Sequence, residues 1–154
     1  MNIENSFHID AAPALVFSVL IDIESVAPCF PGAKLTETRE HNSYSGEVRV
    51  KLGPVAVTFV GEMVIVAQDS DALTCTLQAR ASDRKQRGTV ESVIVFSVTD
   101  AQNGTLVHAA TDLQLSGPIA QYGRAAGMIE KLAAKNIDQF AAALAAKIAA
   151  TTTA

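Results

Sequence analysis

The sequence contains no tryptophan, few aromatic residues and only two cysteines. Aromatic side chains make up 5% of the 154 residues, which disfavours a surface built to stack nucleic-acid bases. Cys29 and Cys75 lie far apart and have neither the spacing of metal ligands nor that of a disulfide framework. We therefore expect a protein of a reducing compartment that holds no metal and no cofactor.

Excess basic charge and long apolar runs are also missing. The net charge at pH 7 is -4 and the isoelectric point is about 5.3, unlike a typical nucleic-acid-binding protein. No apolar run approaches the roughly 20 residues that span a bilayer, and residues 1–5 do not resemble a signal peptide. These absences favour a cytoplasmic protein that does not bind nucleic acid.

The length and hydrophobic content of the sequence are typical of one globular domain. Hydrophobic residues make up 49% of the chain, enough for a substantial core. We place the domain at residues 1–150 and a short tail at 151–154. Residues 2–9 alternate between apolar and polar side chains, as in a strand with one wet face. Two short helices are expected within residues 13–27, and the proline-containing segment 28–32 ends them.

From residue 33 onward the hydrophobic period is two, which predicts further strands in succession. Tight turns between them favour antiparallel pairing and therefore an α+β fold. Gly61, inside one strand, predicts a bend or bulge. Beyond Gly117 and Pro118 the apolar residues recur at spacings of three and four, which predicts one long helix. The expected strands are 33–40, 44–52, 55–65, 73–79, 90–98 and 105–116.

No group of residues has the composition of a catalytic or metal site. His8 and His108 fall on the outward faces of their strands and His41 lies in a turn, so we expect ordinary surface residues. Cys75 faces inward and is best explained as a small core residue. No spacing of histidine, cysteine and carboxylate suggests zinc. We therefore expect a protein that is not an enzyme.

The inward side chains are nearly all apolar and line either a filled core or a pocket. Close packing is the default for protein interiors, but a single helix that crosses a curved sheet leaves concave space beside its small residues. In a pocket, Tyr122 is the natural polar group, because a buried tyrosine hydroxyl needs a partner. The candidate ligand-binding residues are Phe30, Phe59, Met63, Leu77, Phe96, Leu113, Tyr122, Ala126, Ile129 and Ala133.

Positive charge is concentrated near one predicted hairpin turn, at Arg80, Arg84, Lys85 and Arg87. The simplest explanation is a solvated turn. The alternative is a patch that steers docking to an acidic partner or an anionic lipid surface. We keep these four as candidate docking residues and expect at most weak peripheral contact with a membrane.

Five short motifs follow one another along nearly the whole chain. They are Pro-Gly-Ala at 31–33, Tyr-Ser-Gly at 44–46, Lys-Leu-Gly-Pro-Val at 51–55, Phe-Val-Gly at 59–61 and Ser-Gly at 116–117. In order and spacing they resemble the family of the carbon monoxide dehydrogenase G subunit, of the START-like, polyketide cyclase-like superfamily. The resemblance implies the helix-grip fold, in which a curved antiparallel sheet of about seven strands wraps a long C-terminal helix, with two short helices after the first strand.

The same resemblance implies an accessory role beside a molybdenum-containing hydroxylase, without catalytic residues. Members are expected to bind a hydrophobic ligand such as a quinone or lipid, or to recruit the dehydrogenase to the membrane. Longer members carry a further apolar segment, and this sequence ends at Ala154, so recruitment through such a tail is not expected. Two alternatives stay open. One is a START-like enzyme of the aromatase/cyclase or hydrolase type, and the other is a structural assembly factor without ligand.

Overall fold

The computed structural model describes residues 1–123 and 127–152. The strands are β1 (Asn2–Ile9), β2 (Ala33–Arg39), β3 (Ser43–Leu52), β4 (Val55–Asp69), β5 (Thr74–Asp83), β6 (Thr89–Ala101) and β7 (Gly104–Ser116). The helices are α1 (Pro13–Leu20), α2 (Ile23–Val26), the 3-10 turn η1 (Ala27–Cys29), α3 (Ala120–Gly123) and α4 (Met128–Thr152). The strands form one seven-stranded antiparallel sheet in the order β1-β7-β6-β5-β4-β3-β2. The expected α+β, helix-grip architecture is therefore confirmed.

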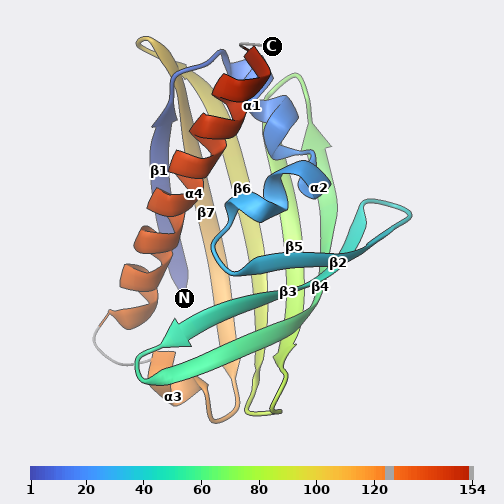
Figure 1. Ribbon diagram of the computed structural model, residues 1–154, viewed down its shortest axis with the longest axis vertical. Helices are drawn as coiled ribbons and strands as arrows, with labels where there is room; N and C mark the ends of the chain where they lie inside the picture. The colour runs from blue at the N-terminus through green and yellow to red at the C-terminus, as the bar shows by residue number, and fades with distance from the viewer. Residues whose placement is uncertain (124–126, 153–154) are drawn as a thin grey trace.

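The sheet is strongly curved, and β2, β3 and the first part of β4 run across the direction of β5 to β7 (Figure 1). Gly46 and Gly61 face each other in neighbouring strands where the sheet curls. A Cβ atom at Gly61 would clash with the carbonyl oxygen of Arg80, so only glycine fits this position. The sequence predicts a bend or bulge here. The register shift lies instead between Ile65 and Ala67, and Gly61 itself stays in register.

The C-terminal helix begins later than the sequence predicts. Gly127 adopts a φ of +72°, in the left-handed region that a right-handed helix excludes, and α4 starts directly after it. Ile119 precedes the short α3 and is fully buried, although its spacing suggested the long helix. α4 continues to Thr152 and so includes the first two residues of the expected tail. In the part of the chain described, no helix is long and apolar enough to cross a lipid bilayer.

The buried side chains form two clusters, one at each end of the sheet. The α1 core joins α1 and α2 to β5, β6, β7 and the second half of α4, with Val16 and Leu144 wholly buried. The α3 core joins the start of β1, the β3–β4 hairpin and the start of α4, with Leu52 and Ile119 at its centre. Figure 1 shows α1 and α3 at opposite ends of the molecule. The space between the two clusters is where a ligand site is to be sought.

Candidate functional site

A row of inward side chains crosses the concave face of the sheet between the two cores. Each residue of the row lies opposite the next on the neighbouring strand, in the order Leu113, Ser92, Ala79, Met63, Tyr44 and Thr38. All six retain solvent exposure, although strand alternation points them to the same side as the core residues. Close packing would leave no accessible surface there, so open space lies in front of them. We call this row the central band.

Small side chains make the middle of the concave face shallow. Ser92 and Ala79 lie at the centre of the central band, and the next row along the same face contains Ala81, Gly61 and Gly46. α4 packs chiefly along β1, at one edge of the sheet, rather than over these middle strands. Short side chains beneath and a helix to one side together leave the middle of this face less covered than the two cores.

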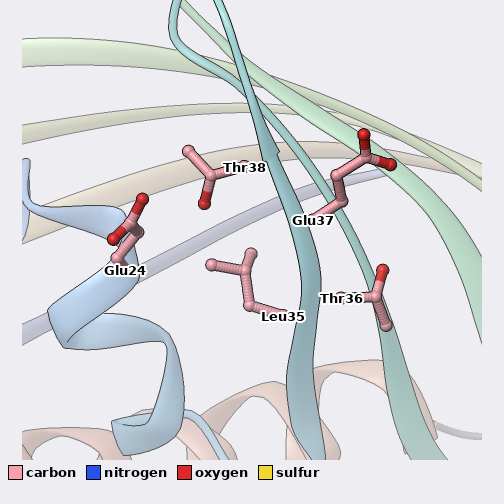
Figure 2. A pocket seen from close by; sticks show the side chains of 5 residues that line it. All are labelled: Glu24, Leu35, Thr36, Glu37 and Thr38. Atoms are coloured by element: carbon pink, nitrogen blue, oxygen red, sulfur yellow. The ribbon is translucent and has the colours of Figure 1, made fainter.

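A surface hollow of about 320 Å³ lies between α2 and β2 (Figure 2). The side chains of Leu35 and Thr38 point toward Glu24 on α2, whereas Thr36 and Glu37 point to the opposite side of β2. A register shift between Leu35 and Glu37 explains this arrangement, because one extra residue in β2 lets two positions three apart face the same side. The bulge therefore turns a threonine toward the mouth of the hollow.

Tyr44 is the titratable group of the central band, and it lies next to this mouth. Its partner on β2 is Thr38, which lines the hollow. Partial burial raises the pKa of Tyr44, and the carboxylates of Glu24 and Asp22 raise it further. Tyr44 is therefore protonated at neutral pH, and its hydroxyl is suited to donate a hydrogen bond to a ligand. Strand alternation already pointed Tyr44 inward, but sequence reasoning chose Tyr122 as the polar group.

The titration of Tyr44 tests this environment. In a Tyr122→Phe background Tyr44 is the single tyrosine of the chain, so ultraviolet absorbance follows its ionisation alone. We expect a pKa above the ordinary value of 10.0, and a fall toward that value in Glu24→Gln. The pKa should stay raised in part, because burial is the larger cause. No response to Glu24→Gln would mean that Tyr44 does not face α2.

Three phenylalanines connect the segment after η1 to the long helix and the first strand. The ring centroids of Phe30 and Phe140 are 6.3 Å apart, and those of Phe140 and Phe7 are 6.1 Å apart. All three side chains are only partly buried. Such tilted and edge-on contacts add stability beyond the burial of apolar area. Phe30 thus packs against α4 without entering either core.

Replacement of Phe30 by alanine should cost about 1–2 kcal/mol of unfolding free energy, because part of the ring surface is already exposed. Phe17, which is 3% exposed and contacts Phe96 in the α1 core, is the matched control. Phe17→Ala should cost about 3–5 kcal/mol, as for other buried phenylalanines. Denaturant titration of both variants measures the difference. Equal losses would place Phe30 in the core.

The family model for the G subunit of carbon monoxide dehydrogenase (CoxG) matches residues 6–149, nearly the whole chain. The chain belongs to the CoxG family. This confirms the family expected from the five motifs. No curated protein matches the sequence.

Solved structures share the fold of this family member at low sequence identity. A conserved protein from Geobacillus kaustophilus has a TM-score of 0.82 at 17% identity, covering 98% of this chain and 97% of its own. A protein from Thermus thermophilus has a TM-score of 0.70 at 17% identity, with 98% and 99% covered. The Zhui aromatase/cyclase from Streptomyces sp. R1128 has a TM-score of 0.65 at 13% identity, with 96% and 93% covered. These likenesses establish the fold alone.

Two of the expected ligand-binding residues of this family member lie in the central band. Met63 and Leu113 are both inward and partly exposed. Leu77 and Phe96 lie in the neighbouring rows toward the α1 core and are 8% and 7% exposed. All four therefore lie on the concave face, in the central band or between it and the α1 core.

The other expected residues lie toward the α3 core or outside the described part of the chain. Phe59 and Ile129 are buried together in the α3 core, and Ala133 packs against it from α4. They lie on the other side of the central band from Leu77 and Phe96. Ala126 and the side chain of Tyr122 lie outside the residues that the structure describes.

Two of the expected docking residues form ion pairs on the outer face of the sheet. The Nε atom of Arg80 lies 3.2 Å from a carboxylate oxygen of Glu91, and both side chains are exposed. Arg84 pairs with Glu47 on β3. Exposed pairs of this kind contribute little to stability. They do reduce the net positive charge that these two arginines present.

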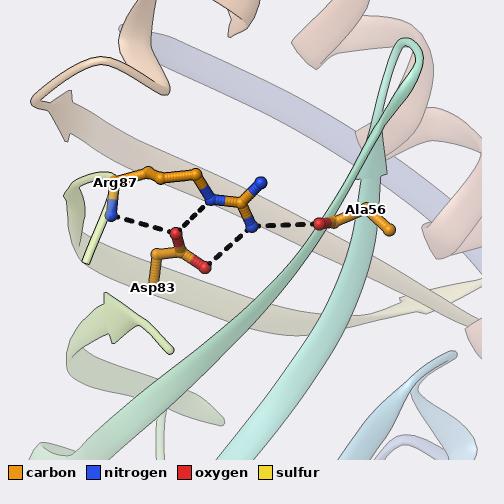
Figure 3. Close-up of polar contacts among 3 residues, drawn as sticks. All are labelled: Ala56, Asp83 and Arg87. Carbon is orange, nitrogen blue, oxygen red and sulfur yellow. Dashed lines mark hydrogen bonds and ion pairs between the residues drawn. The ribbon is translucent and has the colours of Figure 1, made fainter. Parts of the chain in front are cut away.

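Arg87 holds a buried carboxylate that sequence reasoning placed in a solvated turn. Asp83 is 2% exposed and accepts hydrogen bonds from Arg87 Nε at 2.5 Å, Nη2 at 3.1 Å and the backbone nitrogen at 3.0 Å (Figure 3). Arg87 Nη2 also donates to the carbonyl oxygen of Ala56 at 3.1 Å. These bonds, above all those from the side chain, hold the pKa of Asp83 at about 2. The i,i+4 spacing of Asp83 and Arg87 was the available signal.

Proposed function

We propose that this protein binds a hydrophobic small molecule of quinone or lipid type in the hollow in front of the central band. In this proposal it is a non-catalytic, cytoplasmic accessory protein of a molybdenum-containing hydroxylase of the carbon monoxide dehydrogenase type. The observation that carries the proposal is the solvent exposure of six inward side chains between two buried cores. Membership of the CoxG family supports this class of partner.

The chemistry of the hollow favours a ligand with an apolar body and one hydrogen-bond acceptor. Met63 and Leu113 offer apolar contact, and the protonated hydroxyl of Tyr44 offers a donor. A quinone carbonyl is such an acceptor. Glu24 at the mouth, with Asp22 nearby, disfavours a carboxylate headgroup through repulsion between like charges.

The same chemistry argues against an enzyme of the aromatase/cyclase type. Of the six side chains of the central band, Tyr44 is the one that titrates, and its raised pKa makes it a poor base at neutral pH. Likeness to the Zhui aromatase/cyclase is a likeness of fold. A binding role therefore fits the band better than acid–base catalysis.

Titration calorimetry with a short-tailed benzoquinone tests the binding role. We expect one quinone site per chain and weaker binding of a fatty acid of similar length than of the quinone. Tyr44→Phe removes one hydrogen bond to the ligand, so its quinone affinity should fall about 2- to 10-fold. Thr76→Val, on the outer face of β5 opposite Val95, is the control and should bind as the unmodified protein does. Failure of every apolar probe to bind would contradict the proposal.

The accessory role is tested separately, by the genes and proteins that accompany this one. We expect genes for the subunits of a molybdenum hydroxylase beside its own gene. We also expect the purified hydroxylase to co-elute with this protein on size-exclusion chromatography. A protein that binds quinone but has neither neighbour nor complex would keep the binding role and lose the accessory one.

A further inference from the structure

A second hollow, of about 560 Å³, lies between the β3–β4 hairpin and the turn that joins β5 to β6. Its volume is within the range of small-molecule sites, about 300–1,000 Å³. Five basic side chains line it, and we call it the basic groove: Arg49, Lys51, Arg84, Lys85 and Arg87. The chain as a whole carries a net charge of -4, so this concentration of positive charge runs against the overall composition.

Two carboxylates offset only part of this charge. Asp83 is held by Arg87, and Glu47 pairs with Arg84. Arg49, Lys51 and Lys85 are exposed, and within residues 1–123 and 127–152 the structure gives them no ion pair. The basic groove therefore presents a local excess of three positive charges.

The groove is held in shape by bonds that cross between its two sides. The buried pair of Asp83 and Arg87 reaches β4 through the carbonyl oxygen of Ala56 (Figure 3). The backbone nitrogen of Arg84 donates to the carbonyl oxygen of Thr58 at 2.8 Å. These bonds fix the turn beside β4, so that Lys85 is presented without a further loss of backbone freedom on binding.

We propose that the basic groove binds a multiply charged anion that bears phosphate groups. Guanidinium groups match the oxygens of a phosphate in pairs, and a lysine adds a point charge. A hollow with three uncompensated cations suits two phosphate groups better than one carboxylate, because a single negative charge would leave most of the excess unpaired. The groove lies at the end of the sheet away from α2, so it is a separate site from the apolar hollow.

Calorimetry with inorganic pyrophosphate at low ionic strength tests this site. The groove variant is Arg49→Gln with Lys85→Gln. The control is Arg80→Gln with Lys131→Gln, which removes the same charge from exposed positions outside the groove. We expect the groove variant to bind pyrophosphate at least about tenfold more weakly, and the control to change by less than about threefold. Thermal unfolding of both variants checks that the fold is retained.

A second arm uses vesicles that contain a lipid with a phosphomonoester headgroup. Free pyrophosphate that binds and competes with the vesicles would assign the groove to a soluble phosphate compound. Vesicle binding that the groove variant alone loses, without binding of pyrophosphate, would assign it to a lipid headgroup. Equal weakening in both variants, or no binding in either arm, would overturn the proposed site.

Discussion

The Ala79→Phe variant is expected to fold about as stably as the unmodified protein and to lose its affinity for apolar ligands. Ala79 lies at the centre of the central band, between Ser92 and Met63, and retains solvent exposure. A phenyl ring there occupies the hollow. The unfolding free energy should change by less than about 0.5 kcal/mol, and quinone affinity should fall at least about tenfold, equivalent to about 1.4 kcal/mol.

The matched control is Ala110→Phe, on the outer face of β7 opposite Glu4 and Val95. It adds the same ring to the same sheet and should leave quinone affinity unchanged. If the interior were closely packed at Ala79, the added ring would cost about 1–3 kcal/mol of stability. Denaturant titration together with calorimetry of the two variants therefore distinguishes a hollow from a filled core.

Asp83→Asn is expected to produce the other large effect, a loss of stability at neutral pH and a changed response to acid. The pKa of Asp83 is about 2 in the folded protein against an ordinary value of 3.8. Its ion pair therefore stabilises the fold fully above about pH 4, and that stabilisation is lost as the pH falls toward about 2. Asp83→Asn should be less stable at pH 7 and should lose less stability over this acid range.

The control for this change is Asp69→Asn, at the end of β4 before the turn to β5. Asp69 Oδ1 accepts backbone hydrogen bonds from Asp71 and Ala72 at 3.0 Å each, and the residue is exposed. An asparagine oxygen replaces that acceptor, so the unfolding free energy should change by less than about 0.5 kcal/mol. Urea titrations at several pH values compare both variants. Parallel acid curves for Asp83→Asn and the unmodified protein would show that the pair is not what stabilises this turn.

The fold was predictable because each element carries its own local pattern. Strand alternation correctly assigned Met63 and Leu113 to the inward face, and the register of the sheet then places them in one row. The five motifs also predicted the family, which the match over residues 6–149 confirms. Because such local signals recur in every element, the predicted fold stays correct when the boundaries of single elements are slightly wrong.

The mouth of the hollow was not predictable, because it depends on one extra residue. The register shift between Leu35 and Glu37 turns Thr38 toward α2. No residue type in this stretch indicates a bulge. Strict alternation from Leu35 assigns Thr38 to the face that points away from α2. Similarly, the contact between Phe30 and Phe140 joins segments far apart in the sequence, which no local pattern reveals.

The hydrophobic pattern also predicted neither the burial of Asp83 nor the true start of the long helix. Aspartate is a residue type that is common in turns. The burial of Asp83 depends on its hydrogen bond with Arg87, which also donates to the carbonyl oxygen of Ala56 in the β3–β4 hairpin. The apolar spacing from Ile119 onward suggested one uninterrupted helix, and the positive φ of Gly127 overrides it. Both features follow from tertiary contacts or backbone conformation rather than from hydrophobic periodicity.

Native mass spectrometry of the purified protein, followed by extraction of any bound compound, tests the central claim most directly. We predict that each chain carries one apolar molecule, or takes up one molecule of a short-tailed quinone when it is purified empty. We predict that Ala79→Phe carries none and takes up none, while Ala110→Phe behaves as the unmodified protein does. A mass that corresponds to the bare chain under all of these conditions, in all three proteins, would contradict the account.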